Sequence, residues 1–326
     1  MTPLLVILKD PEGSAFDFSA VTREYGLPVR HVRSVAEAEP FLAETEIMVT
    51  LGPHLGPDAA QLFASMPRLR WVQLISTGTD NVAEHLAGTG VALTNAHGLH
   101  GRQMSEAALC AMLTLSRDIP RVIRNQGARH WDRFHSTLLS GKTVGILGVG
   151  AIAEALAPIC RAIGMRTVGI SASPRPLAAF DEMRARTPLF AAVADLDYLV
   201  VLAPYSAATH HLIKADVFAA MKPTAFIVNL ARGGIIDEAA LLSALDGNQI
   251  AAASLDVFER EPLPADHPIW AHPKIVVTPH VGGFHDSYPT DVAALMADNV
   301  RLFLSGGPDT LINRVTLPER LLNAAE

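Results

Sequence analysis

Cysteine is scarce in this chain of 326 residues, which has only Cys110 and Cys160. Two cysteines are too few for a disulfide framework or a cysteine-based metal site. Each of them lies within an apolar helical pattern, so we expect both to be free, buried thiols.

Long apolar runs and targeting signals are also missing. The first ten residues, MTPLLVILKD, have no basic start, and their apolar run ends at Lys9 and Asp10. This pattern predicts a first strand instead of a signal peptide. No apolar stretch approaches the roughly 18–20 uncharged residues that a membrane span requires. We therefore expect a soluble protein of the cytoplasm with no membrane partner.

Charge is sparse as well, at 18% of the residues, and the net charge is -7. The charges are scattered, and the absence of a basic stripe or arginine-rich arm argues against nucleic acid as a partner. An anionic substrate would need a local cationic site, because the overall field does not attract it. By contrast, 49% of the residues are hydrophobic. The chain can therefore form a substantial core, and its length leaves room for two domains.

Short apolar runs alternate with helical patterns along nearly the whole chain. The predicted strands are Leu4–Leu8, Ile47–Leu51, Trp71–Ile75, Val91–Thr94, Thr143–Leu147, Thr167–Ile170, Tyr198–Leu202, Ala225–Asn229, Ala252–Leu255 and Ile275–Thr278. The main helical patterns are Val35–Thr45, Pro57–Ser65, Gln103–Ser116 and Tyr288–Leu304, and a polar, arginine-rich stretch spans residues 117–140. Such alternation predicts an α/β protein with two parallel-sheet domains of Rossmann-like or flavodoxin-like type.

A glycine-rich turn follows the strand that begins at Thr143. Glycine at position 148 permits a tight turn, and glycine at position 150 lets the backbone approach a pyrophosphate. A small residue at Ala153 allows close packing of the next helix, whose first residues, Ala151 and Ile152, present N–H groups to phosphate. Since strand, turn, helix and second strand follow in order, we expect a dinucleotide-binding domain over residues 98–286. Residues 1–97 and 287–326 then form the other domain.

The cofactor preference depends on the end of the second strand of this unit. Ser171 stands where a carboxylate usually bonds the adenine ribose 2′-OH, and Ser173 and Arg175 follow it. Loss of the carboxylate removes repulsion against a 2′-phosphate, and these three residues offer it hydrogen bonds and charge. The sequence therefore favours NADP(H). NAD(H) stays open, because Arg175 is equally consistent with a solvated loop residue.

Three further motifs follow in order: IVNLARGGIIDEAAL at 227–241, SLDVFEREPLP at 254–264 and VTPHVGG at 277–283. With them the chain resembles the D-isomer-specific 2-hydroxyacid dehydrogenases, over nearly its whole length and most specifically over 141–283. The resemblance implies reduction of a small, anionic 2-keto acid to the D-2-hydroxy acid. It also implies an active site in the cleft between two domains, and a homodimer in which Trp131 and Phe134 make contacts.

The resemblance implies a catalytic trio of Arg232, Glu261 and His280. A protonated imidazole at His280 can donate a proton to the carbonyl oxygen as hydride reaches the carbon. The carboxylate of Glu261 would orient the ring and favour imidazolium, and Arg232 would fork onto the substrate's carboxylate and carbonyl. Taken alone, Arg232 could be a surface ion-pair residue and His280 a structural histidine. Glu259 is expected to be a solvated neighbour, because the E-P-L-P motif selects Glu261.

The same resemblance implies further contacts. The amino-terminal domain binds substrate through the N–H groups of Thr77 and Gly78, and glycine permits such a close approach. Asp256 is expected near the nicotinamide, with a turn role as the alternative, and Asp237 is expected only to cap a helix. The other expected cofactor contacts are Ala203, Pro204, Thr209, Leu230, Ala231 and Gly282. Residues that could line the substrate pocket are Leu51, His100, Arg102, Phe284, His285 and Tyr288.

Two other functions share much of this pattern. A formate or phosphite dehydrogenase would need no carbonyl proton donor, and the ordinary E-P-L-P and T-P-H motifs argue against it. A non-catalytic, dinucleotide-sensing corepressor can retain the trio, so this alternative stays open. The histidines at 267, 272, 280 and 285 have no common zinc spacing, and we expect no metal.

Overall fold

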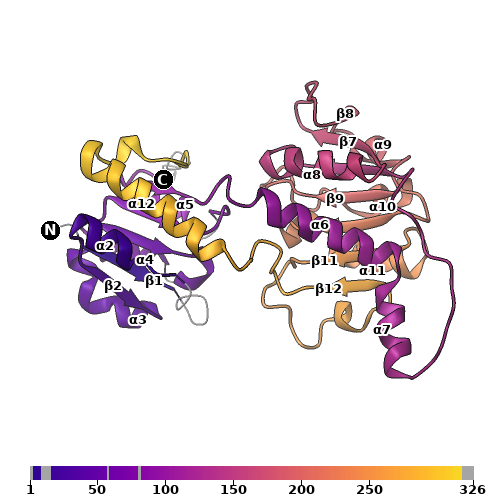
Figure 1. Ribbon diagram of the computed structural model, residues 1–326, viewed down its shortest axis with the longest axis horizontal. Coiled ribbons are helices and arrows are strands. Elements are labelled where there is room, and N and C mark those ends of the chain that lie inside the picture. The colour runs from indigo at the N-terminus through magenta and orange to yellow at the C-terminus, as the bar shows by residue number, and fades with distance from the viewer. Residues whose placement is uncertain (1–2, 9–15, 57–58, 80–81, 318–326) are drawn as a thin grey trace, which may run out of the picture. The chain divides into compact units, whose positions relative to one another are not determined.

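The computed structural model describes residues 3–8, 16–56, 59–79 and 82–317. The chain divides into two compact units, one made of residues 1–100 and 285–326, the other of residues 101–284. Each unit contains one wholly parallel sheet with helices on both faces, drawn in Figure 1. The predicted α/β class with two parallel-sheet domains is therefore confirmed.

The first unit has a five-stranded sheet in the order β2-β1-β3-β4-β5, which is the flavodoxin-like order. Its strands are β1 (Leu4–Ile7), β2 (Val29–Val32), β3 (Ile47–Thr50), β4 (Trp71–Leu74) and β5 (Ala92–Thr94). Four of them were predicted. The fifth, β2, was missed because it is an edge strand with Arg30 and His31 exposed in its middle, so it lacks a continuous apolar run.

Helices cover both faces of this sheet. They are α2 (Ser19–Tyr25), α3 (Val35–Ala38), α4 (Ala59–Ala64), α5 (Ala83–Leu86) and α12 (Tyr288–Gly306), with 3-10 turns η1 (Glu39–Glu44), η2 (Gly52–Leu55) and η5 (Pro308–Thr310). Figure 1 shows α12, in yellow, beside α2. The prediction of one helix over 35–45 is wrong, because a proline at position 40 cannot continue the α-helix and a 3-10 turn follows.

The second unit has a seven-stranded sheet in the order β12-β11-β10-β9-β6-β7-β8. Its strands are β6 (Thr143–Leu147), β7 (Arg166–Ser171), β8 (Glu182–Ala185), β9 (Tyr198–Val201), β10 (Phe226–Asn229), β11 (Ala252–Leu255) and β12 (Ile275–Val277). The strand order reverses between β6 and β9, and in such sheets ligands bind at the carboxyl ends of the strands at that point. The edge strand β8 was missed because its sequence, Glu-Met-Arg-Ala, is not an apolar run.

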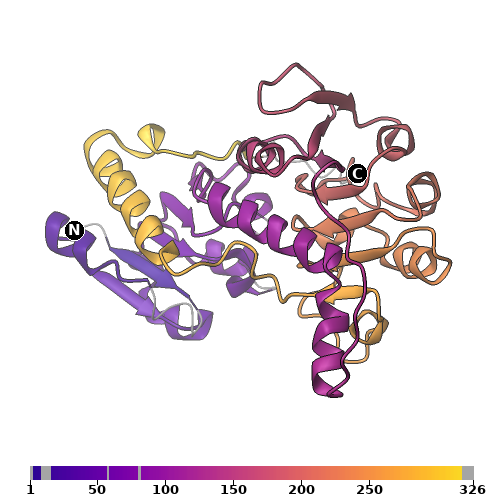
Figure 2. The same cartoon turned by 45° about the vertical axis from the view of Figure 1, so that its right-hand side comes forward.

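Two layers of helices flank the second sheet. They comprise α6 (Gly101–Ser116), α7 (Ile119–Gly127), α8 (Ala151–Ala162), α9 (Leu189–Val193), α10 (Ala215–Ala220) and α11 (Glu238–Asp246), with 3-10 turns η3 (Gly233–Ile235) and η4 (Pro268–Ala271). Helices α6 and α8 pack together in one core, whereas α9, α10 and α11 contribute to another. Figure 2 shows α7 extending from the body of this unit, followed by a long extended return to β6. We had predicted only a polar stretch there.

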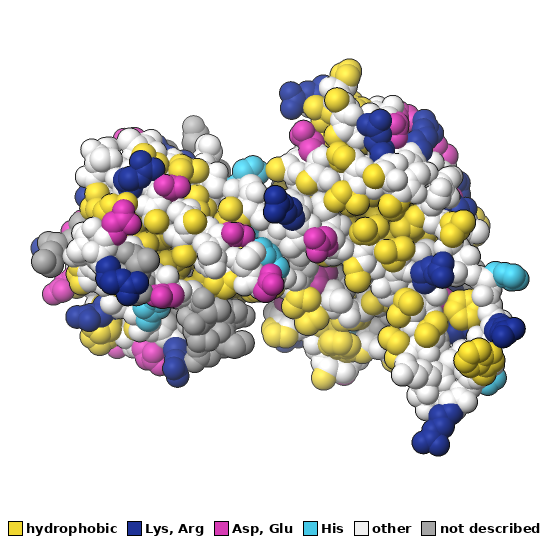
Figure 3. Space-filling view, viewed as in Figure 1, with side chains coloured by type: hydrophobic (Ala, Val, Ile, Leu, Met, Phe, Trp, Pro, Cys, Tyr) yellow, Lys and Arg dark blue, Asp and Glu magenta, His cyan; other side chains and the backbone are white. Residues whose placement is uncertain are grey.

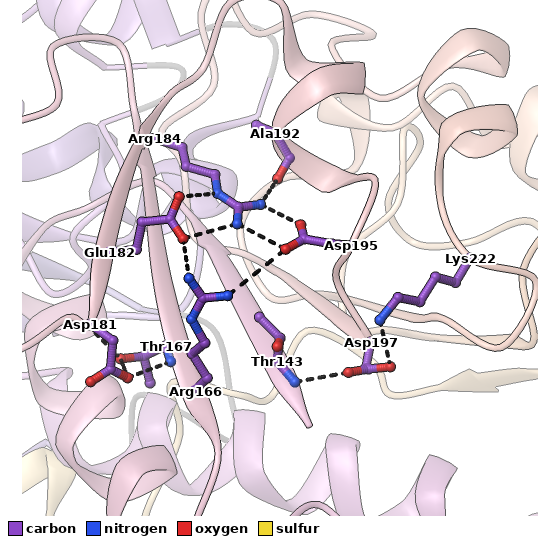
Figure 4. Close-up of polar contacts among 10 residues, drawn as sticks. All are labelled: Thr143, Arg166, Thr167, Asp181, Glu182, Arg184, Ala192, Asp195, Asp197 and Lys222. Carbon is purple, nitrogen blue, oxygen red and sulfur yellow. Dashed lines mark hydrogen bonds and ion pairs between the residues drawn. The ribbon is translucent and has the colours of Figure 1, made fainter. Parts of the chain in front are cut away.

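The amino ends of β6–β9 are joined by a cluster of charged side chains (Figure 4). Arg184 of β8 bonds the carboxylates of Glu182 and Asp195 at 2.7 and 2.5 Å. Arg166, at the start of β7, bonds Glu182 at 2.6 Å. These contacts tie β7, β8 and the segment before β9 together, and Arg184 pairs with Ile170 near the end of β7.

The two cysteines differ in environment. Cys160 is fully buried on α8, and burial raises the pKa of its thiol to about 12. The expectation that Cys110 is buried is wrong, since it lies on the exposed side of α6. Among the residues that the structure describes, no helix is both long enough and apolar enough to cross a membrane.

Candidate active site

The glycine-rich turn requires glycine at position 148 for two reasons. Gly148 has a φ of 97°, and a Cβ there would lie 2.4 Å from the backbone of Ala203. Its N–H donates to the carbonyl of Ile170 at 3.0 Å, which ties the turn to β7. The turn and the Ala203 loop are therefore held together at the carboxyl ends of β6 and β9.

The same turn leaves the start of α8 open. Gly150 is the N-cap of α8 and offers no side-chain cap, and a Cβ at this position would meet nothing within 4 Å. The helix then begins with Ala151 and Ile152, while Ala153 is buried against the sheet. Helix α8 has twelve residues, and its open amino terminus fits the pyrophosphate of a dinucleotide.

The segment after β7 carries positive charge without a carboxylate partner. The Ser171 hydroxyl accepts the N–H of Ser173 at 3.2 Å. Arg175 is exposed, and the structure gives its guanidinium no bond to any described residue. Arg186 was not singled out from the sequence, because β8 was not predicted. Its N–H donates to the carbonyl of Ser171 at 2.8 Å, so a second arginine adjoins this position.

Thr209 uses its side chain within its own loop. Its hydroxyl is buried, donates to the carbonyl of Pro204 at 2.9 Å and accepts the N–H of Ser206 at 2.8 Å. This arrangement fixes the loop that begins at Ala203, beside Gly148. The hydroxyl therefore shapes the loop.

Glu261 and His280 are in direct contact. The Nδ1 atom of His280 lies 2.6 Å from Oε2 of Glu261, whose Oε1 accepts the N–H of Phe258 at 2.9 Å. Burial alone would raise the pKa of Glu261. The bonds from His280 and Phe258 and the charge of Arg232 outweigh burial and hold that pKa below its usual value. An ionised Glu261 can only accept, so the hydrogen on His280 lies on Nδ1.

Arg232 lies in the loop after β10, where Asn229 holds it. The Nδ2 atom of Asn229 donates to the carbonyl of Arg232 at 3.1 Å, and its Oδ1 accepts the N–H of Ala231 at the same distance. One guanidinium nitrogen donates to the carbonyl of Ala231 at 2.7 Å. Gly233, the residue after Arg232, lies against the backbone of Phe258, so all three predicted catalytic residues lie in one region of the second unit.

Asp256 makes the hydrogen bonds of a turn residue. Its buried carboxylate accepts the hydroxyl of Thr278 at 2.5 Å and the N–H groups of Val281 and Gly282 at 3.0 and 2.9 Å. A Cβ on Gly282 would lie 3.6 Å from the side chain of Leu230, so these expected cofactor residues adjoin one another. The sequence could not show that Asp256 holds the loop that carries His280.

Comparison with known proteins identifies the family. The model of the D-isomer specific 2-hydroxyacid dehydrogenase, NAD binding domain, matches residues 109–282. This chain belongs to the D-isomer-specific 2-hydroxyacid dehydrogenase family. It is therefore an NAD(P)-dependent dehydrogenase, and the resemblance carried by the sequence motifs is confirmed.

Three relatives of this dehydrogenase match it over most of their length. It is 34% identical over 274 residues to glyoxylate/hydroxypyruvate reductase B of Pectobacterium atrosepticum, covering 82% of this chain and 85% of the relative. A solved family member from Aeromonas salmonicida is 31% identical with a TM-score of 0.86, covering 97% and 99%. Another, from Xanthobacter autotrophicus in complex with NADPH and MES, is 29% identical with a TM-score of 0.80, covering 97% and 98%.

The first unit of the dehydrogenase contains the loop expected to bind substrate. The carbonyl of Thr77 accepts Nδ2 of Asn95 at 2.8 Å, and that of Gly78 accepts the Ser76 hydroxyl at 2.9 Å. Among the described residues, the structure gives the N–H groups of Thr77 and Gly78 no acceptor. The Thr77 hydroxyl lies 2.9 Å from Nδ1 of His100.

Tyr288, the first residue of α12, belongs to the core of this unit. It is buried in the core, and its hydroxyl donates to the carbonyl of Ile75. His100 and His285 both lie against its ring, with centroid separations of 5.1 and 5.4 Å. Tyr288 therefore fixes the start of α12 to the strand that precedes the Thr77 loop.

Proposed function

We propose that this dehydrogenase reduces a small 2-keto acid to the D-2-hydroxy acid with NADPH, using His280 as the proton donor. The observation that carries the proposal is the contact of 2.6 Å between His280 and an ionised Glu261, with the charge of Arg232 beside them. This combination supplies a proton, a group that stabilises the protonated donor, and a cation for an anionic substrate.

The chain's own residues have distinct tasks in this reaction. With Nδ1 committed to Glu261, the Nε2 atom of His280 is the one that passes a proton to the carbonyl oxygen. The negative charge of Glu261 stabilises the imidazolium until that transfer. Arg232 binds the carboxylate and polarises the carbonyl by paired hydrogen bonds. When bound, the reduced nicotinamide supplies the hydride.

The first unit supplies donors of the right kind for the substrate's carboxylate. The N–H groups of Thr77 and Gly78 have no acceptor among the described residues, while their carbonyls are held by Asn95 and Ser76. Two N–H groups in a rigid loop can bind a carboxylate without a counter-charge of their own. We assign Thr77 and Gly78 to this task.

The preference for NADPH rests on the segment after β7. The Ser171 and Ser173 positions offer hydrogen bonds, and Arg175 and Arg186 are cations without a carboxylate partner among the described residues. A carboxylate at position 171 would repel a 2′-phosphate, and none is present. The solved relative from Xanthobacter autotrophicus binds NADPH, which supports the same choice.

We also propose that the enzyme is a homodimer formed through α6, α7 and the segment that follows. Figure 3 shows hydrophobic side chains gathered over α6 and α8. An open groove of about 500 Å³ lies along α6, lined by Leu109, Leu113 and Ile119. Trp131, on the extended return from α7, is 84% exposed. An apolar surface of this kind favours burial against a second copy.

The function is tested by initial rates of NADPH and NADH oxidation with glyoxylate, hydroxypyruvate, pyruvate and phenylpyruvate. We expect turnover with at least one of them, preference for NADPH, and loss of turnover in His280→Ala with dinucleotide binding retained. Tight dinucleotide binding without turnover of any keto acid would contradict the proposal and favour a dinucleotide-sensing binding protein.

A further inference from the structure

One tight turn in the second unit carries Glu261 and contacts both His280 and the loop of Arg232. It comprises residues 258–261 and follows β11. Within it, the N–H of Phe258 donates to Glu261, which contacts His280. A Cβ on Gly233, the residue after Arg232, would lie 1.8 Å from the carbonyl carbon of Phe258. The position of the turn therefore governs how the three groups lie relative to one another.

Glu238 holds this turn from outside. It is the first residue of α11 and is 9% exposed, which is unusual for a carboxylate. Its Oε1 accepts the N–H of Glu259 at 2.8 Å, and Oε1 of Glu259 accepts the N–H of Glu238 at 3.3 Å. Glu259 is exposed, as expected, and it is also one half of a reciprocal pair between α11 and the turn.

Two histidines flank this pair of carboxylates. The Nε2 atom of His211 lies 3.0 Å from Glu259, and that of His267 lies 3.5 Å from Glu238. Burial raises the pKa of Glu238, and the charges of Glu259 and Glu261 act in the same direction. Burying a carboxylate beside two others is costly, and the hydrogen bond that Glu238 accepts from Glu259 offsets part of that cost.

We propose that Glu238 is a positioning residue for catalysis. Its carboxylate holds the N–H of Glu259 and thereby fixes the turn from which Glu261 orients His280. This inference rests on the proposed function, because it assumes that the contact between Glu261 and His280 serves proton transfer. Glu238 touches neither substrate nor cofactor in this scheme, and it acts only through the turn.

The experiment compares Glu238→Ala with Glu238→Gln. Both remove the charge, but only glutamine keeps an oxygen that can accept the N–H of Glu259. We expect kcat to fall on the order of 10–100-fold in the alanine variant, since misplacement by about 1 Å can cost 10²-fold. The glutamine variant should stay within about threefold, because it keeps the acceptor that maintains alignment. The Kd for NADPH should not change in either variant.

Asp237→Ala is the matched control. Asp237 caps the same helix by accepting the N–H of Ala240 at 2.9 Å, but it has no bond to the turn. We expect it to lower Tm while leaving kcat unchanged. Equal kcat in the alanine and glutamine variants, or an Asp237→Ala defect as large as that of Glu238→Ala, would overturn the proposal.

Hydrogen exchange supplies a readout that does not depend on turnover. In Glu238→Ala the amide of Glu259 should lose protection, whereas the amide of Ala240 should lose it in Asp237→Ala. Failure of the wild-type enzyme to turn over any keto acid would refute the proposed function and leave this measurement intact. Unchanged protection of Glu259 in Glu238→Ala would refute the positioning role itself.

Discussion

The backbone N–H of His280 donates to the carbonyl of Asp256 at 2.8 Å, and His280 has a φ of 55°. The left-handed region costs a non-glycine residue roughly 1–2 kcal/mol. The loop after β12 offsets this cost, because Asp256 also binds Thr278, Val281 and Gly282 through its carboxylate. His280 is therefore held in a backbone conformation that it would not adopt by itself.

Asp256→Asn should lower both stability and kcat. The Asp256 carboxylate is the acceptor in all three hydrogen bonds. The amide nitrogen of an asparagine would therefore face at least one N–H or O–H group. Leaving a buried donor without an acceptor costs about 1–3 kcal/mol, to be measured by urea unfolding. Loss of the loop geometry should lower kcat, measured from initial rates.

Thr278→Val removes one donor and leaves the carboxylate intact, so its effect should be smaller. Wild-type values for Asp256→Asn would contradict this account.

The sequence predicted the parts of the fold and site that depend on local pattern. Strands buried on both faces were predicted because their apolar runs are continuous, and Gly148 was found because its strand-turn-helix context is local. The edge strands β2 and β8 were missed because half-exposed strands carry polar residues. The roles of Glu238 and Asp256 depend on contacts between residues 21 and 26 positions apart, as between Glu238 and Glu259 and between Asp256 and Gly282. No spacing rule relates such positions.

The acid stability of the enzyme should depend on Glu261. Its folded pKa lies below its usual value, so its contribution to stability is fully present above the unfolded pKa of about 4.5. That contribution is lost as the pH falls through the folded pKa. The free energy of unfolding should therefore decline more steeply below about pH 4.5 in the wild-type enzyme than in Glu261→Gln. Urea unfolding between pH 3 and 7 measures this difference.

Glu238→Gln is a control, because it should change the pH dependence of the free energy of unfolding in the opposite direction. Because burial raises the folded pKa of Glu238, its ionisation in the folded state is unfavourable. The wild-type enzyme should then lose stability relative to Glu238→Gln as the pH rises above the unfolded pKa. If both variants changed the dependence of the free energy of unfolding on pH in the same direction, the pKa directions given for Glu261 and Glu238 would be contradicted.

The preference for NADPH should depend on Arg175 and Arg186 together. Arg175 follows Ser171 closely along the chain, and the backbone N–H of Arg186 donates to the carbonyl of Ser171. Neither arginine has a carboxylate partner among the described residues. Each alanine variant should weaken binding of 2′,5′-ADP by about 10–100-fold, since a charge-assisted bond contributes roughly 1.5–3 kcal/mol. Binding of 5′-AMP should be unchanged. Calorimetric titration measures both ligands, and equal losses for the two would refute a role in recognising the 2′-phosphate.

Arg184→Ala should destabilise the second unit without affecting catalysis. The Arg184 side chain is 17% exposed and bonds Glu182, Asp195 and the carbonyl of Ala192 (Figure 4). Its removal leaves the Ala192 carbonyl without this donor, and it leaves Glu182 and Asp195 with Arg166 as their remaining arginine partner, which should cost about 1–3 kcal/mol. Urea unfolding should show this loss.

The matched variant Arg166→Ala removes an arginine whose side chain is 52% exposed. It should cost less than about 1 kcal/mol, because exposed ion pairs contribute little. Both variants should retain wild-type kcat and KM, since the partners of the two side chains are not among the residues assigned to substrate or cofactor. A fall in kcat for Arg184→Ala in fully folded protein would show that the cluster acts on the site through the sheet.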